Sequence, residues 1–153
     1  MTPDEISGRL HEFEALCRAQ GLPVTVQRRA ILVAVLGRND HPTADQVHAL
    51  VKLQLPGLSR TTVYRVLETL VDMGLIRQLH HPGASARYDG KIQRHHHLVC
   101  THCHAVIDVE SAALNALNPE VTGKHGFEIQ DYSVHFIGLC AKCRAKRTKR
   151  RRD

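Results

Sequence analysis

The stretch RHHHLVCTHCH, residues 94–104, combines three consecutive histidines with a Cys-x-x-Cys pair and two further histidines. A second Cys-x-x-Cys pair follows near the end of the chain, and Cys17 stands alone as a small residue on the first predicted helix. A Cys-x-x-Cys turn presents two thiolates to one ion, and two such turns complete a tetrahedral zinc site. The spacing therefore predicts one structural zinc, rather than four buried thiols or a redox dithiol, with four ligands: Cys100, Cys103, Cys140 and Cys143.

The histidines of this stretch require a separate explanation, because four thiolates close a zinc site without them. His95 and His97 alternate, so on a strand they share one face while His96 points to the other. Imidazoles combined with carboxylates suit iron(II) or manganese(II) better than an ion that prefers thiolates. The sequence thus offers a second metal site, against the alternative of surface histidines without metal, and its candidate ligands are His41, Asp89, His95, His97 and Asp108.

The first 90 residues contain the pattern of a DNA-binding domain. Apolar residues recur with helical spacing, and Thr43 followed by Gln46 predicts a capping box. LIRQLHHPGASARYDG, residues 75–90, predicts a hairpin around a Pro-Gly turn. Helices followed by a hairpin are typical of a winged helix-turn-helix, whose second helix enters the major groove. The predicted helices cover residues 4–19, 26–37, 41–55 and 59–74.

The character of the chain changes after about residue 91. HLVC, AVIDVE, FEIQDY and VHFIGLC alternate and are rich in β-branched residues, which predicts strands, and residues 111–126 predict a helix. A domain of about fifty residues has a small core and usually needs an additional stabilising element such as a bound zinc ion. The predicted fold class is therefore α+β: an N-terminal winged helix-turn-helix domain over residues 1–90, followed by a small α/β domain with structural zinc over residues 91–143.

The charge of the chain is concentrated at its end. The formal net charge is +6, and residues 144–153 hold seven basic residues and one acidic residue, which accounts for the whole excess. Such a run predicts a basic flexible tail that contacts nucleic-acid phosphates, or alternatively a solvated tail that keeps the protein soluble.

The sequence gives no sign of a membrane or of secretion. No apolar run approaches the length of a membrane span, and the first residues carry acids without an apolar signal region. We therefore expect a cytoplasmic protein with no membrane partner. In that compartment five cysteines favour metal ligation over disulfides.

Eight stretches together resemble the ferric uptake regulator family over nearly the whole chain: VTVQRRAIL, HPTADQVH, LSRTTVYRVLETLVDMGLI, ARYD, HHHLVCTHC, VIDVE, HGFEI and GLCAKC. The resemblance implies a homodimeric, metal-activated DNA-binding regulator in which residues 91–143 form the dimerisation domain. It implies that the four cysteines of the paired motifs hold structural zinc. It also implies that the regulatory iron or manganese site uses His41, Asp89, His95, His97 and Asp108.

Details of the resemblance favour one branch of the family. Most iron-uptake regulators carry Glu at the ligand that ends the hairpin, whereas this chain has Asp89 there and Asp108 later, as the peroxide sensors do. The chain departs from the family pattern at two positions. Pro23, just before the second helix, replaces a basic residue that often reaches DNA, and His104, just after Cys103, replaces a glycine. A further metal site of some members is not predicted, because its positions hold poor ligands: Arg94, His96, Asn115 and Tyr132.

The start of the fourth predicted helix supplies the candidate DNA contacts. Arg65 can read guanine or pair with phosphate, and Tyr64 can contact a thymine methyl group or phosphate, against the alternative of a solvated helix face. The predicted DNA-binding residues are Arg60, Thr61, Thr62, Tyr64 and Arg65.

These features predict a metal-dependent transcriptional repressor of operator DNA that senses peroxide. The alternatives are an iron-level sensor of the same family and a zinc-ribbon nucleic-acid module without metal regulation. An enzyme with a small-molecule substrate is not expected, because a zinc hydrolase or deaminase needs a His-Glu-x-x-His motif, or a His-x-Glu paired with Pro-Cys-x-x-Cys, and the chain has neither.

Overall fold

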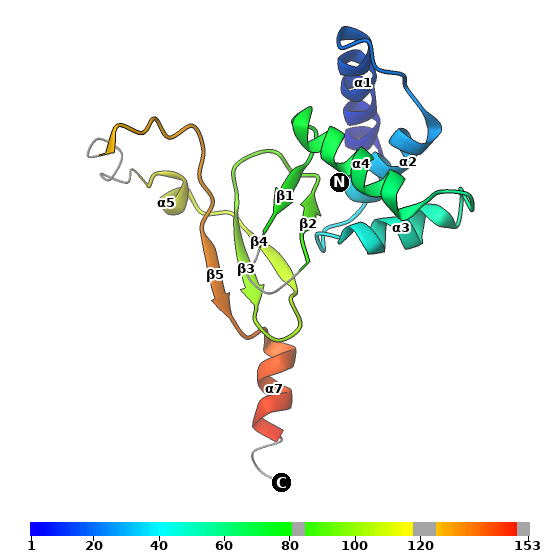
Figure 1. Cartoon of the computed structure of the whole chain (residues 1–153). Coiled ribbons are helices and arrows are strands. Elements are labelled where there is room, and N and C mark those ends of the chain that lie inside the picture. Colours follow the sequence, from blue (N-terminus) through cyan, green and yellow to red (C-terminus); the bar gives the residue numbers. More distant parts are fainter. Residues whose placement is uncertain (81–84, 118–124, 150–153) are drawn as a thin grey trace. The chain divides into compact units, whose positions relative to one another are not determined.

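The structure is a computed structural model, which describes residues 1–80, 85–117 and 125–149 of the 153-residue chain. The chain folds into two compact units, Met1–Ile92 and Gln93–Asp153. The first unit is mainly helical, and the second is built around a small sheet (Figure 1). Among the described helices, none is long and apolar enough to cross a membrane.

The first unit contains four helices and a two-stranded hairpin, and all four predicted helices are confirmed. Local caps explain where they begin: the side chains of Thr2, Thr25, Thr43 and Ser59 each accept a hydrogen bond from a backbone amide three residues later. The elements are α1 (Pro3–Ala19), α2 (Val26–Leu36), α3 (Ala44–Lys52), α4 (Arg60–Asp72), β1 (Arg77–Leu79) and β2 (Arg87–Asp89).

The core of this unit joins α3 and α4 into a helix-turn-helix. One face of α4 is apolar and packs into this core, since Val63, Leu67 and Leu70 are fully buried. They belong to one cluster with Leu32 of α2 and Val47 of α3. Burying each such side chain stabilises a fold by about 1.5–3 kcal/mol. The cluster therefore holds α4 in one orientation, with its opposite face exposed to solvent.

The hairpin follows directly from the end of α4. Gly74 has φ 70°, a left-handed conformation that favours glycine and ends the helix. β1 and β2 then pair antiparallel, with Arg77 opposite Asp89, so the predicted hairpin is confirmed. The predicted Pro-Gly turn at residues 82–83 lies outside the described residues.

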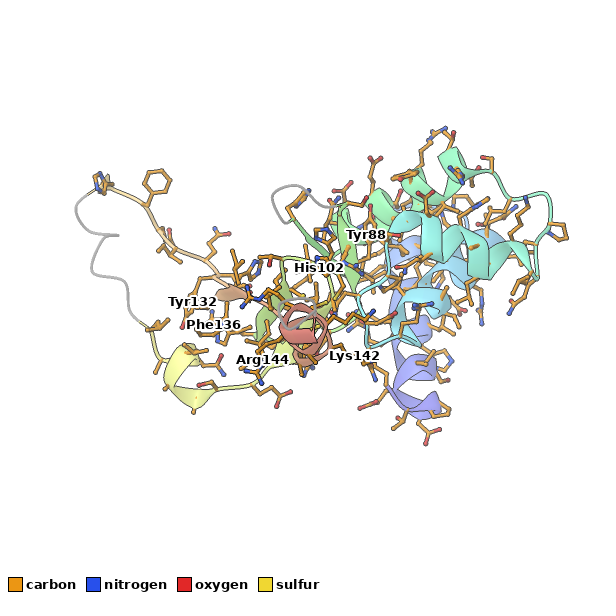
Figure 2. The ribbon with its side chains drawn as sticks, turned by 90° about the horizontal axis from the view of Figure 1, so that it is seen from below. Tyr88, His102, Tyr132, Phe136, Lys142 and Arg144 are labelled. Atoms are coloured by element: carbon orange, nitrogen blue, oxygen red, sulfur yellow. The ribbon has the colours of Figure 1, made fainter. Side chains whose placement is uncertain are left out.

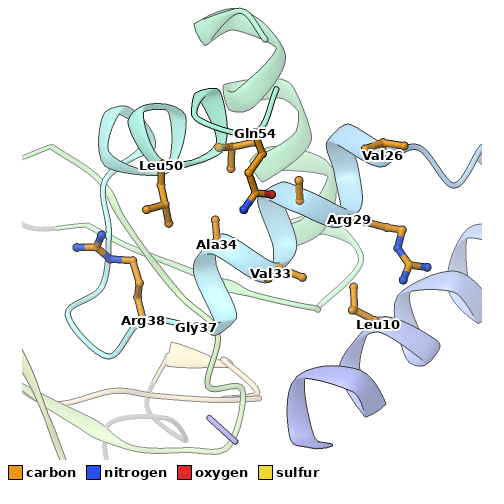
Figure 3. Close-up of a pocket in the computed structure, with 11 residues that line it drawn as sticks. Leu10, Val26, Arg29, Val33, Ala34, Gly37, Arg38, Leu50 and Gln54 are labelled. Carbon is orange, nitrogen blue, oxygen red and sulfur yellow. The ribbon is translucent and has the colours of Figure 1, made fainter. Parts of the chain in front are cut away.

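A groove on the first unit lies between α1, α2 and α3 (Figure 3). Its volume is ≈ 390 Å³, and its lining is mostly apolar, including Leu10, Val33 and Leu50. Arg29 and Arg38 are the charged residues of this lining, which contains no acid, histidine, serine or cysteine. The groove therefore lacks the groups that acid–base or nucleophilic catalysis requires.

In its described residues, the second unit contains a three-stranded sheet and the helices α5 (Ala112–Asn115) and α7 (Ala141–Lys149). β3 (His96–Cys100) lies in the middle, between β4 (Val106–Val109) and β5 (His135–Gly138). β4 pairs antiparallel with β3, and β5 pairs parallel with it. The α+β class and the order of the two kinds of unit are as predicted.

Three features of the second unit differ from the sequence-based expectation. FEIQDY, residues 127–132, is predicted as a strand but forms none, because β5 takes the place beside β3 and leaves Phe127 75% exposed. The helix predicted over residues 111–126 is described only as α5, and residues 118–124 lie outside the described part. Composition predicts a flexible tail from residue 144, whereas residues 144–149 continue α7.

Candidate metal centres and DNA-contact surface

The four predicted zinc ligands come together at one end of the second sheet. Their sulfur atoms all lie within 4.8 Å of one another. Cys103 Sγ is 3.7 Å from Cys140 Sγ. Tetrahedral zinc with Zn–S bonds of about 2.3 Å separates its sulfur ligands by about 3.8 Å, so this spacing fits a four-thiolate zinc centre.

Parallel strand pairing explains why the two cysteine pairs meet. β3 ends at Cys100 opposite Gly138 of β5, so both strands deliver their following residues to the same edge. The Thr101 amide donates to the Gly138 carbonyl at 2.8 Å, and the Cys140 amide donates to Cys100 Sγ at 3.4 Å. The first pair spans a turn at residues 101–103. The second pair instead opens α7, which places Cys143 in the first turn of a helix.

The four thiols differ in acidity. Backbone amides, led by that of Cys140, donate to the sulfur and lower the pKa of Cys100 to about 5. Burial is the main cause that raises the pKa of Cys143 to about 12, and the neighbouring sulfurs add to it. Zinc binds thiolates, so at neutral pH Cys100 offers an ionised ligand and zinc binding must displace the proton of Cys143.

His41 and Asp89 form a buried pair in the first unit. His41 Nε2 lies 3.6 Å from Asp89 Oδ2, and both side chains are nearly inaccessible to solvent. The Lys91 amide donates to the other carboxylate oxygen, Asp89 Oδ1, at 2.8 Å. One imidazole and one carboxylate oxygen thus face each other, an arrangement that suits a borderline divalent ion.

Strand β2 holds this pair in place. Arg87 Nη1 donates to the His41 carbonyl at 2.8 Å, and the Tyr88 amide donates to the Pro42 carbonyl at 2.9 Å. These bonds hold His41 at φ 52°, a left-handed conformation that is rare for residues other than glycine. This role of Arg87 was not predicted from the sequence. The available signal was that Arg87 and Asp89 alternate along β2, so their side chains share one face of the strand.

His95, His97 and Asp108 form a second cluster, within the sheet of the second unit. His97 and Asp108 are partners in the pairing of β3 with β4. Asp108 Oδ1 is 3.5 Å from His95 Nε2 and 4.0 Å from His97 Nε2. Both imidazoles are about 2% exposed, and their ring centroids are 4.7 Å apart.

Neighbouring groups determine which ring nitrogens carry protons. His95 Nδ1 is 2.8 Å from the Gln93 carbonyl, which can only accept, so Nδ1 donates and Nε2 keeps its lone pair. The Ser133 hydroxyl donates to the His95 carbonyl at 3.3 Å, and its oxygen can then accept from His97 Nδ1 at 3.4 Å.

The lone pairs of both Nε2 atoms therefore face a carboxylate oxygen. Three acceptors directed at one point repel each other unless a cation lies among them. Histidine ligands of metals commonly donate their other N–H to a carbonyl in this way. Sequence reasoning did not identify Gln93 or Ser133, and nothing in the sequence patterns distinguished them.

His96 points to the opposite face, as predicted, and takes part in a different network. Its Nδ1 accepts from the Val134 amide at 3.1 Å, so Nε2 carries the proton and donates to Asn115 Oδ1 at 3.1 Å. Its ring stacks on Tyr132, whose hydroxyl donates to the Leu114 carbonyl at 2.7 Å. The guanidinium of Arg94 lies over the Tyr132 ring at 4.5 Å. Hydrogen bonds thus occupy both nitrogens of His96.

The remaining histidines are less organised. His102 and His104 are exposed after β3, and His102 lies in the turn there (Figure 2 labels His102). His135 is half-buried on β5, and its ring packs edge-on against His97 with centroids 5.1 Å apart. It therefore shares the surroundings of a predicted ligand, although it lies outside the clustered donor atoms.

The predicted DNA-contact residues lie in the first two turns of α4. Four of them are exposed, whereas Thr62 is half-buried and its hydroxyl lies 2.8 Å from that of the capping residue Ser59. Arg60 Nε is 3.6 Å from Asp45 at the start of α3. The exposed residues are Arg60, Thr61, Tyr64 and Arg65.

A polar groove runs beside this face of α4. Its volume is ≈ 500 Å³, and Arg28 of α2 and Arg65 of α4 both line it. Arg28 Nη1 donates to the Pro23 carbonyl at 2.8 Å. The chain lacks a basic residue at position 23, and the structure brings the Arg28 side chain to that point instead. Arg28 is a candidate phosphate contact that sequence reasoning missed.

Comparisons with known proteins agree with this geometry. The model of the ferric uptake regulator family matches residues 19–137. The peroxide-responsive repressor PerR of Staphylococcus aureus is 28% identical over 143 residues, which cover 94% of this chain and 97% of that protein.

Two solved structures are also similar. The ferric uptake regulator Fur of Helicobacter pylori superposes with a TM-score of 0.79 at 20% identity, over 91% of this chain and 93% of that chain. The ferric uptake regulator of Francisella tularensis, solved with iron, superposes with a TM-score of 0.69 at 28% identity, over 81% and 96%.

Proposed function

Because the chain belongs to the ferric uptake regulator family, we propose that it is a repressor that senses peroxide through a regulatory iron(II) or manganese(II) ion. The family consists of metal-dependent, dimeric DNA-binding regulators, so the chain is a regulator of transcription and not an enzyme. Its metals are a structural zinc and a regulatory iron or manganese.

The proposed ligands follow from the donor sets. Zinc takes the four cysteine thiolates, which are the soft ligands that it prefers. The regulatory ion takes the pair of the first unit and the cluster of the second, a mixture of nitrogen and oxygen donors that suits iron(II) or manganese(II). These five proposed ligands are His41, Asp89, His95, His97 and Asp108.

The observation that carries the regulatory site is the orientation of the two imidazoles in the second unit. Both Nε2 lone pairs face Asp108, and the Gln93 carbonyl and the Ser133 hydroxyl hold them in that tautomer. A protein that bound no cation here would place three acceptors against each other in a buried position. A resident divalent ion removes this conflict.

Ligands from two units make the ion a switch. An ion that binds His41 and Asp89 together with the cluster of β3 and β4 restricts how the DNA-reading unit can be oriented. Only one orientation in a dimer matches two half-sites on the same face of DNA. Metal and operator then stabilise the same state, so each raises the affinity of the protein for the other.

The carboxylates favour peroxide sensing over iron sensing. At the position of Asp89 most iron regulators carry Glu, whereas peroxide sensors carry Asp there and at the position of Asp108. The S. aureus relative is named as a peroxide-responsive repressor. Iron(II) at the site would supply the electrons that reduce peroxide, whereas manganese(II) does not reduce it readily. The buried imidazoles then become the oxidisable groups closest to the ion.

The other expectations complete this proposal. The functional domains are residues 1–90 for DNA binding and 91–143 for metal binding and dimerisation, followed by the basic segment 144–153, of which residues 144–149 belong to α7. The repressor acts in the cytoplasm, where reducing conditions keep the cysteines available for zinc. Its operator contacts come from the start of α4: Arg60, Thr61, Thr62, Tyr64 and Arg65.

A DNA-binding experiment tests the proposal. The zinc-loaded dimer, with iron(II), manganese(II) or no added metal, is titrated anaerobically against promoter DNA from the source genome, before and after peroxide. We expect either metal to tighten binding and peroxide to abolish binding only with iron(II). Binding that ignores the regulatory metal would favour the zinc-ribbon module instead.

Iron-level sensing is the second candidate function. The relative from F. tularensis, with 28% identity and iron in its structure, supports it. In that case iron(II) tightens DNA binding, and peroxide at low excess does not release the DNA. The same titration therefore separates the two candidates.

A further inference from the structure

Helix α7 carries a concentration of positive charge that the proposed regulatory switch does not use. It contains five basic residues and no acidic residue over nine positions. Figure 2 views this helix end-on and shows Lys142 and Arg144 extending from different sides. The basic residues of the helix are Lys142, Arg144, Lys146, Arg147 and Lys149.

This charge is exposed, whereas the start of the helix is anchored. Lys142, Arg144, Lys146 and Arg147 are exposed, but Cys143 between them is only 8% exposed. The Arg144 amide donates to the Cys140 carbonyl at 2.9 Å, which begins the helix directly at a proposed zinc ligand. The zinc centre therefore holds the first turn, and the later turns extend from it.

The helix is electrostatically unfavourable by itself. Lys142 and Lys146 are four positions apart, and like charges at this spacing destabilise a helix. A helix of nine residues is also marginal in water without tertiary contacts. Binding to a polyanion would remove the repulsion and stabilise the helical form.

The distribution of charge indicates which polyanion binds. Residues 141–153 carry a formal charge of +7, so the other 140 residues carry −1. A DNA-binding protein gains affinity by releasing counterions from each phosphate that it neutralises. In this chain almost all of the excess charge available for that purpose lies in and directly after α7.

We propose that α7 is a second DNA-contact element, anchored at the zinc centre, that binds backbone phosphates outside the bases read by α4. Its contacts are independent of sequence, because contacts to backbone phosphates carry no information about the bases. It raises the affinity for all DNA, and α4 adds specificity. The partner chemistry is duplex phosphate.

The test compares two variants that lose equal charge. Lys146→Gln/Arg147→Gln removes two charges from α7, and Arg18→Gln/Lys52→Gln removes two from the exposed surface of the first unit. Lys142→Arg/Lys146→Arg keeps the charge of α7 and controls for its packing. Zinc content and dimer mass are checked for each. Binding of the zinc- and manganese-loaded dimer to a mixed-sequence DNA duplex is measured by fluorescence anisotropy across a salt series.

We expect Lys146→Gln/Arg147→Gln to weaken DNA binding about tenfold or more near 0.1 M salt. The slope of log K against log[salt] should also become smaller, by about 0.9 for each phosphate that the variant no longer neutralises. The first-unit variant and the Lys→Arg variant should keep the wild-type slope. Equal effects of the two charge-removing variants would overturn the proposal, since net charge alone would then explain the weaker binding. So would an unchanged DNA slope combined with weaker binding to RNA or to anionic lipid vesicles, because α7 would then serve another polyanion.

Discussion

At the scale of single residues, Gln93 and Ser133 determine which nitrogens of His95 and His97 face Asp108. Their contacts to the two Nδ1 atoms leave both Nε2 lone pairs directed at the carboxylate. Groups that orient metal ligands in this way typically change metal affinity by about 10–100-fold when removed. The neighbours of the proposed ligands therefore orient the imidazoles as a bound cation would require.

Ser133→Ala tests this role. We expect the variant to bind manganese(II) about 10–100-fold more weakly, because His97 loses the acceptor that fixes its tautomer. Isothermal titration of the zinc-loaded protein with manganese(II) measures the change. Ser133→Thr keeps the hydroxyl and should restore most of the affinity, and equal affinities in Ser133→Ala and wild type would show that the hydroxyl does not orient the ring.

Cys100→Ser tests the structural zinc. Metal binding and folding share one free energy in such a small unit, so we expect loss of zinc, unfolding of the second unit and loss of the dimer. Zinc content and mass in solution measure this. Cys17→Ser, at a buried cysteine outside the cluster, is the matched control and should keep its zinc. A dimeric Cys100→Ser protein without zinc would contradict the expectation.

Arg65→Ala tests base reading by α4. The side chain is exposed and lines the groove shared with Arg28. If it reads a base, its removal should weaken specific binding by about 1–3 kcal/mol and relax the preference at one position of the operator. Competition between the operator and single-base variants measures both effects. An equal weakening on every sequence would assign Arg65 to phosphate.

At the scale of elements, the residue that caps α3, Thr43, lies two residues after His41, so this cap also bears on the proposed metal site. The Thr43 side chain accepts from the Gln46 amide, and the Gln46 side chain accepts from the Thr43 amide. Thr43 also forms an isolated antiparallel β-bridge with Arg87 of β2. The capping box thus ties the helix start, the His41 loop and the strand of Asp89 together.

Thr43→Ala should lower the free energy of unfolding of the first unit by about 0.5–2 kcal/mol, because it removes the side chain that caps α3. Urea denaturation followed by circular dichroism measures the change. Thr43→Ser keeps a capping hydroxyl and should be destabilised much less. Equal destabilisation in the two variants would indicate that the methyl group, and not the cap, supplies the stability.

Elements that local signals define were predictable from the sequence. Thr43 and Ser59 mark helix starts and Gly74 marks a helix end, since caps depend only on residues within one turn. FEIQDY shows the opposite case, because a strand requires a neighbouring strand and β5 already pairs with β3. The helical form of residues 144–149 was also hidden, since it depends on an anchor at Cys140 and Cys143 rather than on its own composition.

The candidate site divides in the same way. Spacing alone predicted the cysteine cluster, and the alternation of His95 and His97 predicted their common face toward Asp108. Gln93 acts through its carbonyl and Ser133 through its hydroxyl, and such roles leave no pattern in a single sequence. Arg87 alternates with Asp89 along β2, but this signal did not indicate that its guanidinium donates to the His41 carbonyl. They became visible only when the strands placed them beside the imidazoles.

At the scale of the whole molecule, the proposed function depends on one ion shared by two units that each fold around their own core. The first unit contributes one imidazole and one carboxylate, and the second contributes two imidazoles and one carboxylate. Under the proposed function, damage to a single imidazole would weaken the connection between DNA reading and dimerisation without unfolding either unit. A repressor that is inactivated through an oxidisable ligand requires this property.

Peroxide treatment of the loaded protein tests that idea directly. We expect one added oxygen atom on a ligand imidazole when iron(II) is bound and none when manganese(II) is bound, because only iron(II) reduces peroxide readily. By resemblance to the peroxide sensors, His41 and His95 are the expected targets. Anaerobic loading, brief peroxide exposure and peptide mass spectrometry locate the oxygen. His96 is the internal control, since it is equally buried but lies on the opposite face in its own hydrogen-bond network.

The possible results separate three sensors. Oxygen on His41 or His95, together with loss of DNA binding, supports peroxide sensing at the regulatory site. Unmodified histidines in a protein that iron(II) still activates would indicate an iron-level sensor. Loss of DNA binding through oxidation of the four clustered cysteines alone would place the redox switch at the zinc centre, where the Cys100 thiol, with its pKa of about 5, would be the first sulfur to react if zinc is released.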